Sequence, residues 1–256
     1  HSESYRKIRN TFRYLLGNIN DKFEDVNFDG IDIESLPELE KFLLNKIYIL
    51  NQKFETCFHK YDFHNLYKEL LSFCTVDLSA FYFDIRKDTL YCDPINSEKR
   101  KSCVTVLNIL LKSLLRWFAP ILSFTTEEIH QLISKNSKSI HLEKFLTFPE
   151  KFKNEKLEEK WSKLIKIRDI CNISIEEKRA VKEIGSSLEA ELKIKLNSKY
   201  KNIITNNDLS ELCIVSKANV FFDEVSDILV ETKKASGDKC PVCWKISVEP
   251  CEKHSK

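Results

Sequence analysis

The chain has 256 residues, enough to bury a substantial core as one large domain plus a small one, or as two domains. Its formal net charge of +2 is too small to indicate a nucleic-acid binder by itself, so any such function depends on local patches. No apolar run approaches the roughly 20 residues that span a bilayer, and no signal peptide opens the sequence, so we expect a cytoplasmic protein without a membrane segment. Because the sequence contains no Met, we expect His1 to be a fragment boundary or a tag remnant of a longer chain.

The first half of the sequence has helical spacing. Residues 4–19 place their apolar side chains on one stripe, which predicts a helix packed on a core. After a turn-rich stretch at 20–34, Ser35 and Glu38 have capping-box spacing, with a Pro in the first turn of a long helix that continues past Phe54. Further helices are expected over 65–75, 97–118 and about 125–133, where Thr125 to Glu128 again has capping-box spacing, with a packed connector at 77–94 and a surface connection at 134–149.

The period of the pattern changes in the second half. A helix is expected from about 149 to 184, and residues 188–196 then alternate strictly between apolar and charged, which is typical of a half-buried strand. Further strand candidates lie at 211–215, 218–222 and 227–232. We therefore predict a mainly α protein: a helical bundle followed by a small α+β domain and a metal-binding tail.

The sharpest local signal is a set of metal-ligand residues at the C-terminal end. Cys240 and Cys243 are three residues apart, and Cys251 and His254 repeat that spacing after seven intervening residues. Two such pairs can complete a tetrahedral Zn²⁺ shell, and four protein ligands leave no open position, so the zinc would be structural. The alternative is a pair of reduced thiols near a frayed terminus. The remaining cysteines lack ligand spacing and are expected to be reduced core residues, namely Cys57, Cys74, Cys92, Cys103, Cys171 and Cys213.

A row of arginines lies beside the apolar stripe of the first helix. On a helical wheel Arg6, Arg9 and Arg13 fall within roughly 60° of one another, and guanidinium groups bind phosphate oxygens with bidentate, charge-assisted hydrogen bonds. The alternative is a solvated face that pairs with Asp or Glu of the next helix. The sequence leaves both open.

The tail around the cysteines is locally basic. Residues 232–256 contain six Lys and three acidic residues, so the local charge is 6 − 3 = +3. Lys239 and Lys245 flank the possible knuckle, and Trp244 follows its second cysteine. Lysines near an exposed aromatic ring suit single-stranded RNA, because phosphates pair with Lys and bases stack on rings. Trp244 could equally form the core of the small domain.

No catalytic constellation is found in the sequence. The glycines are isolated, which excludes a Gly-rich phosphate loop, and no nucleophile is matched with a base. His59 and His64 lack a second convergent cluster and are expected to be surface or interhelix residues. A free-standing hydrolase or nuclease is therefore excluded for want of an active site.

The order of segments resembles the C-terminal region of bacterial-type isoleucyl-tRNA synthetases, which are class I enzymes. Residues 4–21 look like the opening helix of that family's anticodon-binding bundle, and 78–92 are similar to its middle segment. Residues 114–130 resemble the next helix pair, 168–190 the long helix and the entry to the small domain, and 239–244 the zinc motif. The resemblance spans nearly the whole chain in order. It departs from the family pattern at His254, where a fourth cysteine is expected, and in the short spacer between the two pairs. Either His254 replaces the cysteine, giving a Cys₃His site, or the site is degenerate.

The resemblance implies an anticodon-binding bundle at 1–148, a connecting helix at 149–184, a small α+β domain at 185–235 and a zinc-binding tail at 236–256. It implies recognition of the anticodon stem and loop of isoleucine tRNA by a monomer, with tRNA contacts expected from Arg6, Arg9, Arg13, Lys239, Trp244 and Lys245. ATP would be used only by the catalytic domain of the parent chain, which with the editing domain would lie upstream. The alternative from another class is a helical protein-interaction module with a structural zinc site.

Overall fold

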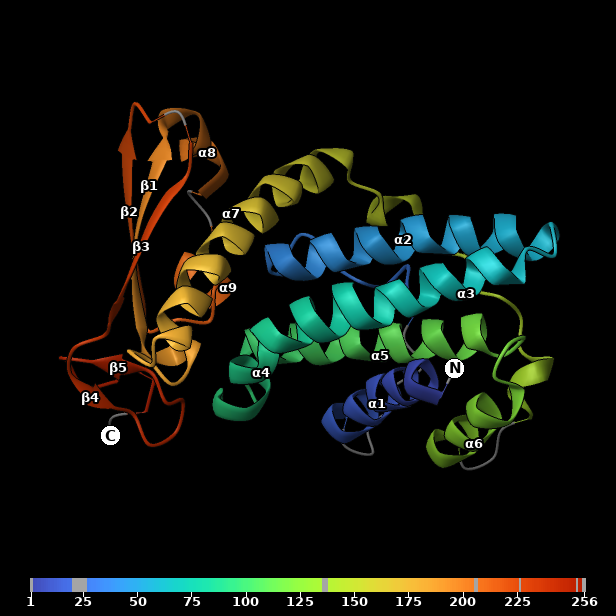
Figure 1. Cartoon of the computed structure of the whole chain (residues 1–256). Helices are drawn as coiled ribbons and strands as arrows, with labels where there is room; N and C mark the ends of the chain where they lie inside the picture. Colours follow the sequence, from blue (N-terminus) through green and yellow to red (C-terminus); the bar gives the residue numbers. More distant parts are fainter. Residues whose placement is uncertain are drawn as a thin grey trace. The chain divides into compact units, whose positions relative to one another are not determined.

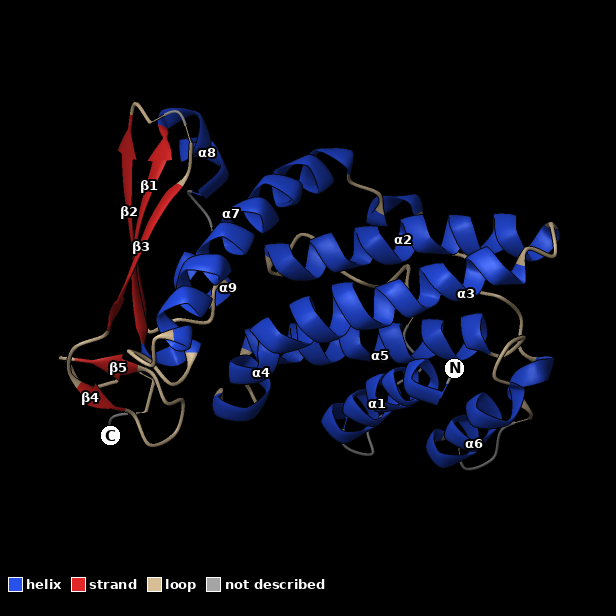
Figure 2. Ribbon diagram, viewed as in Figure 1, coloured by secondary structure: helices blue, strands red, loops and turns tan. Residues whose placement is uncertain are grey.

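The computed structural model describes residues 2–19, 27–134, 138–204, 207–225, 227–251 and 253–254. The chain forms two compact units, residues 1–154 and 155–256. The first is helical and the second combines a long helix with strands (Figures 1 and 2). The expected fold, a mainly α bundle followed by a small α+β domain and a Cys/His cluster, is confirmed. Among the described residues, no helix is both long and apolar enough to cross a membrane.

Helix α5 (Glu98–Phe118) is the centre of the first unit. It is buried on nearly every side and contacts α1, α2, α4 and α6. At its C-terminal end the indole of Trp117 donates a hydrogen bond of 2.9 Å to the Asn51 side chain, which satisfies both buried polar groups. The other elements of this unit are α1 (Ser2–Ile19), α2 (Glu38–His59), α3 (Phe63–Ser72), η1 (Phe73–Tyr82), α4 (Phe83–Cys92), α6 (Ser123–Ile133), η2 (Ile140–Leu142) and η3 (Glu150–Phe152).

The helices expected over 4–19, 97–118 and 125–133 are confirmed, with bounds that differ by two residues or fewer. The connector expected at 77–94 is wrong. Residues 73–82 form a π-helix that joins α3 to α4 without a break. A π-helix bonds residue i to i+5, so Phe73, Leu78 and Phe83 share one buried face at a spacing of five, which a search for the α-helical period does not detect.

The cap of α2 also differs from expectation. The helix begins at Glu38 after Pro37, and no side chain caps it. The Ser35 hydroxyl instead bonds the Asp32 carbonyl oxygen at 2.8 Å, so Ser35 belongs to the preceding turn. The second capping-box pattern, at 125–128, lies inside α6 and caps nothing. The turn-rich character expected at 20–34 is seen over 27–34, while 20–26 lie outside the described residues, as do 135–137 of the expected surface connection.

A buried ion pair joins α2 to α4. The Arg86 guanidinium donates to the Glu40 carboxylate at 2.6 Å, and the two side chains are only 3% and 0% exposed. The Tyr82 hydroxyl donates to the same carboxylate at 3.1 Å and lies 3.4 Å from the Cys103 sulfur. Burial raises the pKa of Tyr82 well above its ordinary value, so the phenol stays protonated and remains a donor.

The second unit is built on a three-stranded sheet. Strand β1 (Ala190–Asn197) lies between β2 (Lys217–Asp223), to which it is parallel, and β3 (Leu229–Lys234), to which it is antiparallel. Helix α7 (Glu155–Ala180) packs on β3, and the Ser174 and Thr232 hydroxyls meet at 2.7 Å. The remaining elements are η4 (Ser187–Glu189), η5 (Ser198–Tyr200), α8 (Lys201–Ile204), α9 (Leu209–Leu212), β4 (Asp238–Lys239) and β5 (Ile246–Ser247).

Three expectations for this unit need correction. Helix α7 is shorter than the expected 149–184. The strand at 211–215 is wrong, because α9 ends there in a turn held by the buried Arg168, whose Nε donates to the Leu212 carbonyl oxygen at 2.9 Å. The strand expected at 227–232 begins two residues later, at Leu229. The alternating strand at 188–196 and the strand at 218–222 are confirmed.

The scattered cysteines are free, as expected, but not all lie in the core. Four of them are buried, and the expectation is wrong for Cys57 and Cys92, which are partly exposed. Both His59 and His64 are exposed, in line with a surface position.

Glu40→Gln is expected to destabilise the first unit by about 3–5 kcal/mol, because it leaves the buried Arg86 charge without its counter-ion. Urea unfolding followed by circular dichroism measures this loss.

Glu98→Gln is the matched control, since Glu98 forms an exposed pair with Lys101 one turn along α5. Its cost should not exceed about 1 kcal/mol. Equal costs for the two variants would contradict the importance of the buried pair.

Candidate metal centre and nucleic-acid interface

The candidate metal ligands lie on a small hairpin. Strands β4 and β5 pair antiparallel, and the loop between them carries the first two cysteines. The Trp244 amide donates to the Cys240 carbonyl oxygen at 3.0 Å, and the Cys240 amide donates to Lys245 at 2.9 Å, so the loop is closed twice. Gly237 enters this hairpin at φ +117°, and a Cβ there would lie 2.1 Å from the Ser247 carbonyl oxygen. Only glycine fits at this position.

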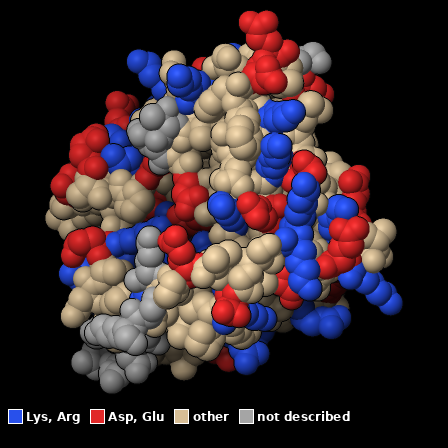
Figure 3. All heavy atoms as spheres, turned by 90° about the vertical axis from the view of Figure 1, so that its left-hand side faces the viewer, with Lys and Arg blue, Asp and Glu red and all other residues tan. Residues whose placement is uncertain are grey.

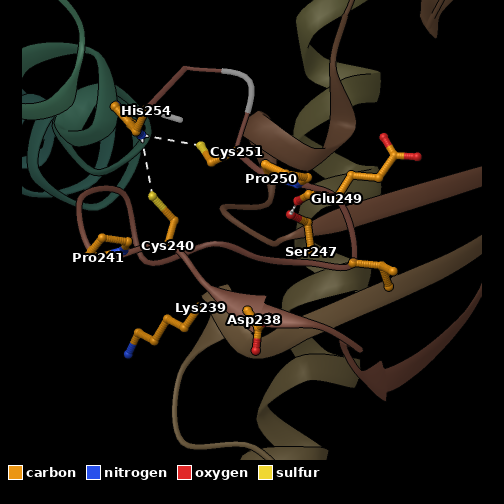
Figure 4. A pocket seen from close by; sticks show the side chains of 10 residues that line it. Asp238, Lys239, Cys240, Pro241, Ser247, Glu249, Pro250, Cys251 and His254 are labelled. Carbon is orange, nitrogen blue, oxygen red and sulfur yellow. Dashed lines mark hydrogen bonds between the residues drawn. The ribbon is translucent and has the colours of Figure 1, made fainter. Parts of the chain in front are cut away.

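Four ligand atoms gather beside the hairpin loop, two from the loop and two from the segment after β5. Nδ1 of His254 lies 3.6 Å from the Cys240 sulfur and 3.3 Å from the Cys251 sulfur, and the Cys243 and Cys251 sulfurs are 3.8 Å apart. All four atoms lie within 4.8 Å of one another, so the group could hold a metal ion. Figure 4 shows the His254 ring directed toward both Cys240 and Cys251.

The surroundings of the two hairpin cysteines differ. The backbone amides of Cys243 and Val242 donate to the Cys240 sulfur and lower its pKa to about 6, which supplies a thiolate. Desolvation raises the pKa of Cys243 to about 12, because burial disfavours its thiolate form. A bound cation would stabilise that thiolate. Three sulfurs and one imidazole are soft and borderline ligands, which favour a transition metal over Mg²⁺ or Ca²⁺.

Ser216 fixes this hairpin to the rest of the second unit. Its hydroxyl accepts a hydrogen bond from the Ile246 amide at 2.6 Å and donates to the Leu188 carbonyl oxygen. The Ser216 amide also donates to the Ala190 carbonyl oxygen at 3.1 Å. Sequence reasoning missed this residue, because a lone Ser thirty residues from its partner carries no periodic or spacing signal.

Trp244 lies on the surface, 59% exposed, and is not the core of a small domain. Its backbone adopts φ +64°, a left-handed conformation that is uncommon for a bulky residue. The Lys239 ammonium lies 5.4 Å from the centre of the indole ring. An exposed ring with a cation beside it can offer a stacking surface to a base.

The two lysines that flank the knuckle are not equivalent. Lys239 is exposed, whereas Lys245 is half-buried and its charge helps to lower the pKa of Asp208, although hydrogen bonds from Ser210 contribute more. We therefore expect Lys239 to be the more accessible of the two.

The arginine row on α1 is exposed along its length. Arg9 pairs with Glu128 at 3.5 Å and donates to the Tyr5 hydroxyl at 3.1 Å. The alternative of an ion pair is thus seen for this arginine, but its partner comes from α6 and not from the next helix. Arg6 and Arg13 form no ion pair with any residue in the described part of the chain. Two of the three charges are thus available to a ligand.

A groove of about 470 Å³ lies between α1 and the π-helix. Sequence reasoning missed it, because it exists only where α1 packs against η1. Its two lysines pair with acidic neighbours on their own helices, Lys7 with Glu3 and Lys87 with Asp84. Its lining includes Asn10, Tyr14, Thr75 and Ser79.

Comparison with known proteins places the chain in a family. A family profile described as the anticodon-binding domain of tRNA ligase matches residues 40–196, which is more than half of the chain. The matched region begins in α2 and ends in β1.

Whole-chain relatives agree with this match. The chain is 62% identical over 255 residues to an isoleucine–tRNA ligase of Pelagibacter ubique, covering 100% of the chain and 28% of that protein. It is 38% identical to the isoleucine–tRNA ligase of Agrobacterium fabrum and 40% to that of Caldicellulosiruptor saccharolyticus, covering 96% of the chain and 26% and 27% of those proteins. The chain thus spans about a quarter of the length of these relatives. It belongs to the anticodon-binding domain family of tRNA ligases, and it corresponds to the C-terminal region of an isoleucine–tRNA ligase.

Proposed function

We propose that this chain binds the anticodon stem and loop of isoleucine tRNA and so supports ATP-dependent aminoacylation by the catalytic domain of a longer isoleucine–tRNA ligase. The observation that carries the proposal is the similarity to isoleucine–tRNA ligases over the whole chain, together with the family match. The partners would be isoleucine tRNA and the catalytic and editing domains of the same parent chain, in a cytoplasmic monomer.

The charges on α1 support a contact with the tRNA backbone. Arg6 and Arg13 are two turns apart on the same helix, so their charges lie about 10 Å apart along its axis. The two guanidinium groups can therefore contact different phosphates along one RNA strand. Each such contact releases counter-ions, so the affinity depends on the salt concentration. Base recognition would come from the unstacked loop, which side chains can reach.

The double variant Arg6→Gln/Arg13→Gln is expected to weaken binding of an isoleucine tRNA transcript and to reduce the slope of log affinity against log salt by about two. Fluorescence anisotropy at several salt concentrations measures both, with valine tRNA as the competitor that tests specificity.

Lys53→Gln/Lys101→Gln serves as the control, because it removes the same charge from exposed, ion-paired sites of the same unit. The slope of log affinity against log salt for this variant should differ from that of the unmodified chain by no more than about 0.5. Binding that is undetectable, or insensitive to salt, or equal for the two tRNAs would refute the proposed function.

We also propose that the Cys/His cluster holds one structural Zn²⁺. In a tetrahedral site with Zn–S of about 2.3 Å and Zn–N of about 2.0–2.1 Å, ligand atoms should lie about 3.8 Å apart for S–S and about 3.5 Å for S–N. The observed separations are 3.8 Å between the Cys243 and Cys251 sulfurs, 3.6 Å from His254 Nδ1 to the Cys240 sulfur and 3.3 Å from it to the Cys251 sulfur. These three separations match those of a tetrahedral zinc site, and all four ligand atoms lie within 4.8 Å of one another, which supports the proposal. Bound zinc would join the hairpin to the end of the chain, and with four protein ligands it would have no catalytic role.

Elemental analysis of the purified chain is expected to find one zinc per chain. His254→Ala should lower zinc affinity by tenfold or more in a chelator competition, since it opens one ligand position.

The control is His141→Ala, which removes an exposed histidine of the first unit. It should not change the affinity. An unmodified chain without zinc would eliminate the site, and an unchanged affinity in His254→Ala would show that His254 is not the fourth ligand.

A further inference from the structure

The outer face of the three-stranded sheet is arranged in transverse rows of three residues. Paired residues of neighbouring strands point to the same side, so the register defines the rows. The first row is Lys217, Glu191 and Lys233; the second is Asn219, Lys193 and Glu231; the third is Phe221, Lys195 and Leu229.

The opposite face of the sheet belongs to the core. The alternate residues of β1, namely Leu192, Ile194 and Leu196, are fully buried, and α7 packs against β3 on that side. The surface drawn in Figure 3 carries charged groups of both signs interspersed with uncharged residues. The outer face is thus the half of the sheet that a ligand can reach.

Both glutamates of the first two rows are ion-paired. Glu191 lies 3.8 Å from the Lys217 ammonium and accepts a hydrogen bond of 2.7 Å from Asn219. Glu231 pairs with Lys233 at 3.0 Å. These contacts are typical of a solvated sheet face. Of the three lysines in these rows, they leave Lys193 without an ion pair among the described residues.

The third row differs. Phe221 is 47% exposed and Leu229 is 54% exposed, with Lys195 between them. Three adjacent strands span about 10 Å, the size of a nucleobase with its sugar. The row contains no acidic residue, and within the described residues neither Lys195 nor Lys193 forms an ion pair. Lys193 instead places its ammonium 5.4 Å from the centre of the Phe221 ring.

We infer that Phe221, Leu229, Lys193 and Lys195 form a stacking platform for an unpaired nucleotide of a tRNA loop. This inference rests on the proposed function and adds a specific contact to it. The base would stack on the Phe221 ring and extend toward Leu229. The two lysines would pair with the phosphates on either side, and the Lys193 ammonium would leave the ring for one of them.

The composition of the platform favours RNA over a protein partner. Lysine is depleted at the centre of protein interfaces. Here Lys195 lies at the centre of the apolar strip, and Lys193 lies beside it in the next row. Single-stranded nucleic acids are bound by aromatic rings with basic side chains beside them.

The test uses the full chain and an isoleucine tRNA transcript with 2-aminopurine in its anticodon loop. Phe221→Ser is expected to weaken binding about 5-fold to 100-fold and to abolish the change in 2-aminopurine fluorescence. Phe221→Trp should preserve both. Lys193→Gln/Lys195→Gln should weaken binding and lower the salt slope. Thermal unfolding of each variant confirms that the sheet is intact.

Lys217→Gln/Lys233→Gln is the matched control, because it removes two charges from the same face at its ion-paired end. It should bind like the unmodified chain. Normal binding and fluorescence in Phe221→Ser would overturn the platform while the proposed function stands. If the unmodified chain binds no tRNA, both fail. Loss of self-association in Phe221→Ser, with tRNA binding unchanged, would assign the strip to a protein contact and would also overturn it.

Discussion

The helical unit depends on one buried ion pair. Glu40 and Arg86 come from helices α2 and α4, and Tyr82 adds a hydrogen bond from the end of the π-helix. Removing two charges from water costs several kcal/mol per ion. Two hydrogen bonds from Arg86 and one from Tyr82 to the Glu40 carboxylate offset that cost. Keeping these hydrogen bonds fixes the relative rotation of three segments, because a small turn of any of them would leave a buried charge without its partner. The apolar surface of α5 stabilises the bundle, and the ion pair selects one packing arrangement.

Much of the fold could be predicted from the sequence where one periodicity holds over several turns. The α1 stripe and the alternation in β1 are such cases, since the apolar residues at the centre of the stripe and every second residue of the strand are buried. The π-helix was missed because five-residue spacing matches neither the helical nor the strand period. The short helix α9 was read as a strand, because four residues are too few to separate the two periods.

The metal ligands were predictable because chain spacing dictates their geometry. Two residues three apart on a tight turn must present their ligand atoms to the same side, and a second such pair completes the shell. What positions the hairpin could not be predicted in this way. Ser216 fixes the hairpin by accepting a hydrogen bond from Ile246, thirty residues later in the chain. The sheet platform depends on the pairing register of β1 with its neighbours, which no local pattern specifies. Contacts between residues far apart in the chain produce no regular spacing in the sequence by which they could be predicted.

The π-helix also determines how the bundle can vary in length. Each π turn is an α turn with one residue added. The ten residues from Phe73 to Tyr82 therefore contain extra residues within the continuous helix formed by α3, η1 and α4. A deletion of one residue within them can convert a π turn to an α turn without breaking the rod. The same deletion in α5 would rotate every following side chain by about 100° and expose the core. The bundle should therefore tolerate the deletion of one residue in the π-helix, whereas the same deletion in α5 should disrupt the core.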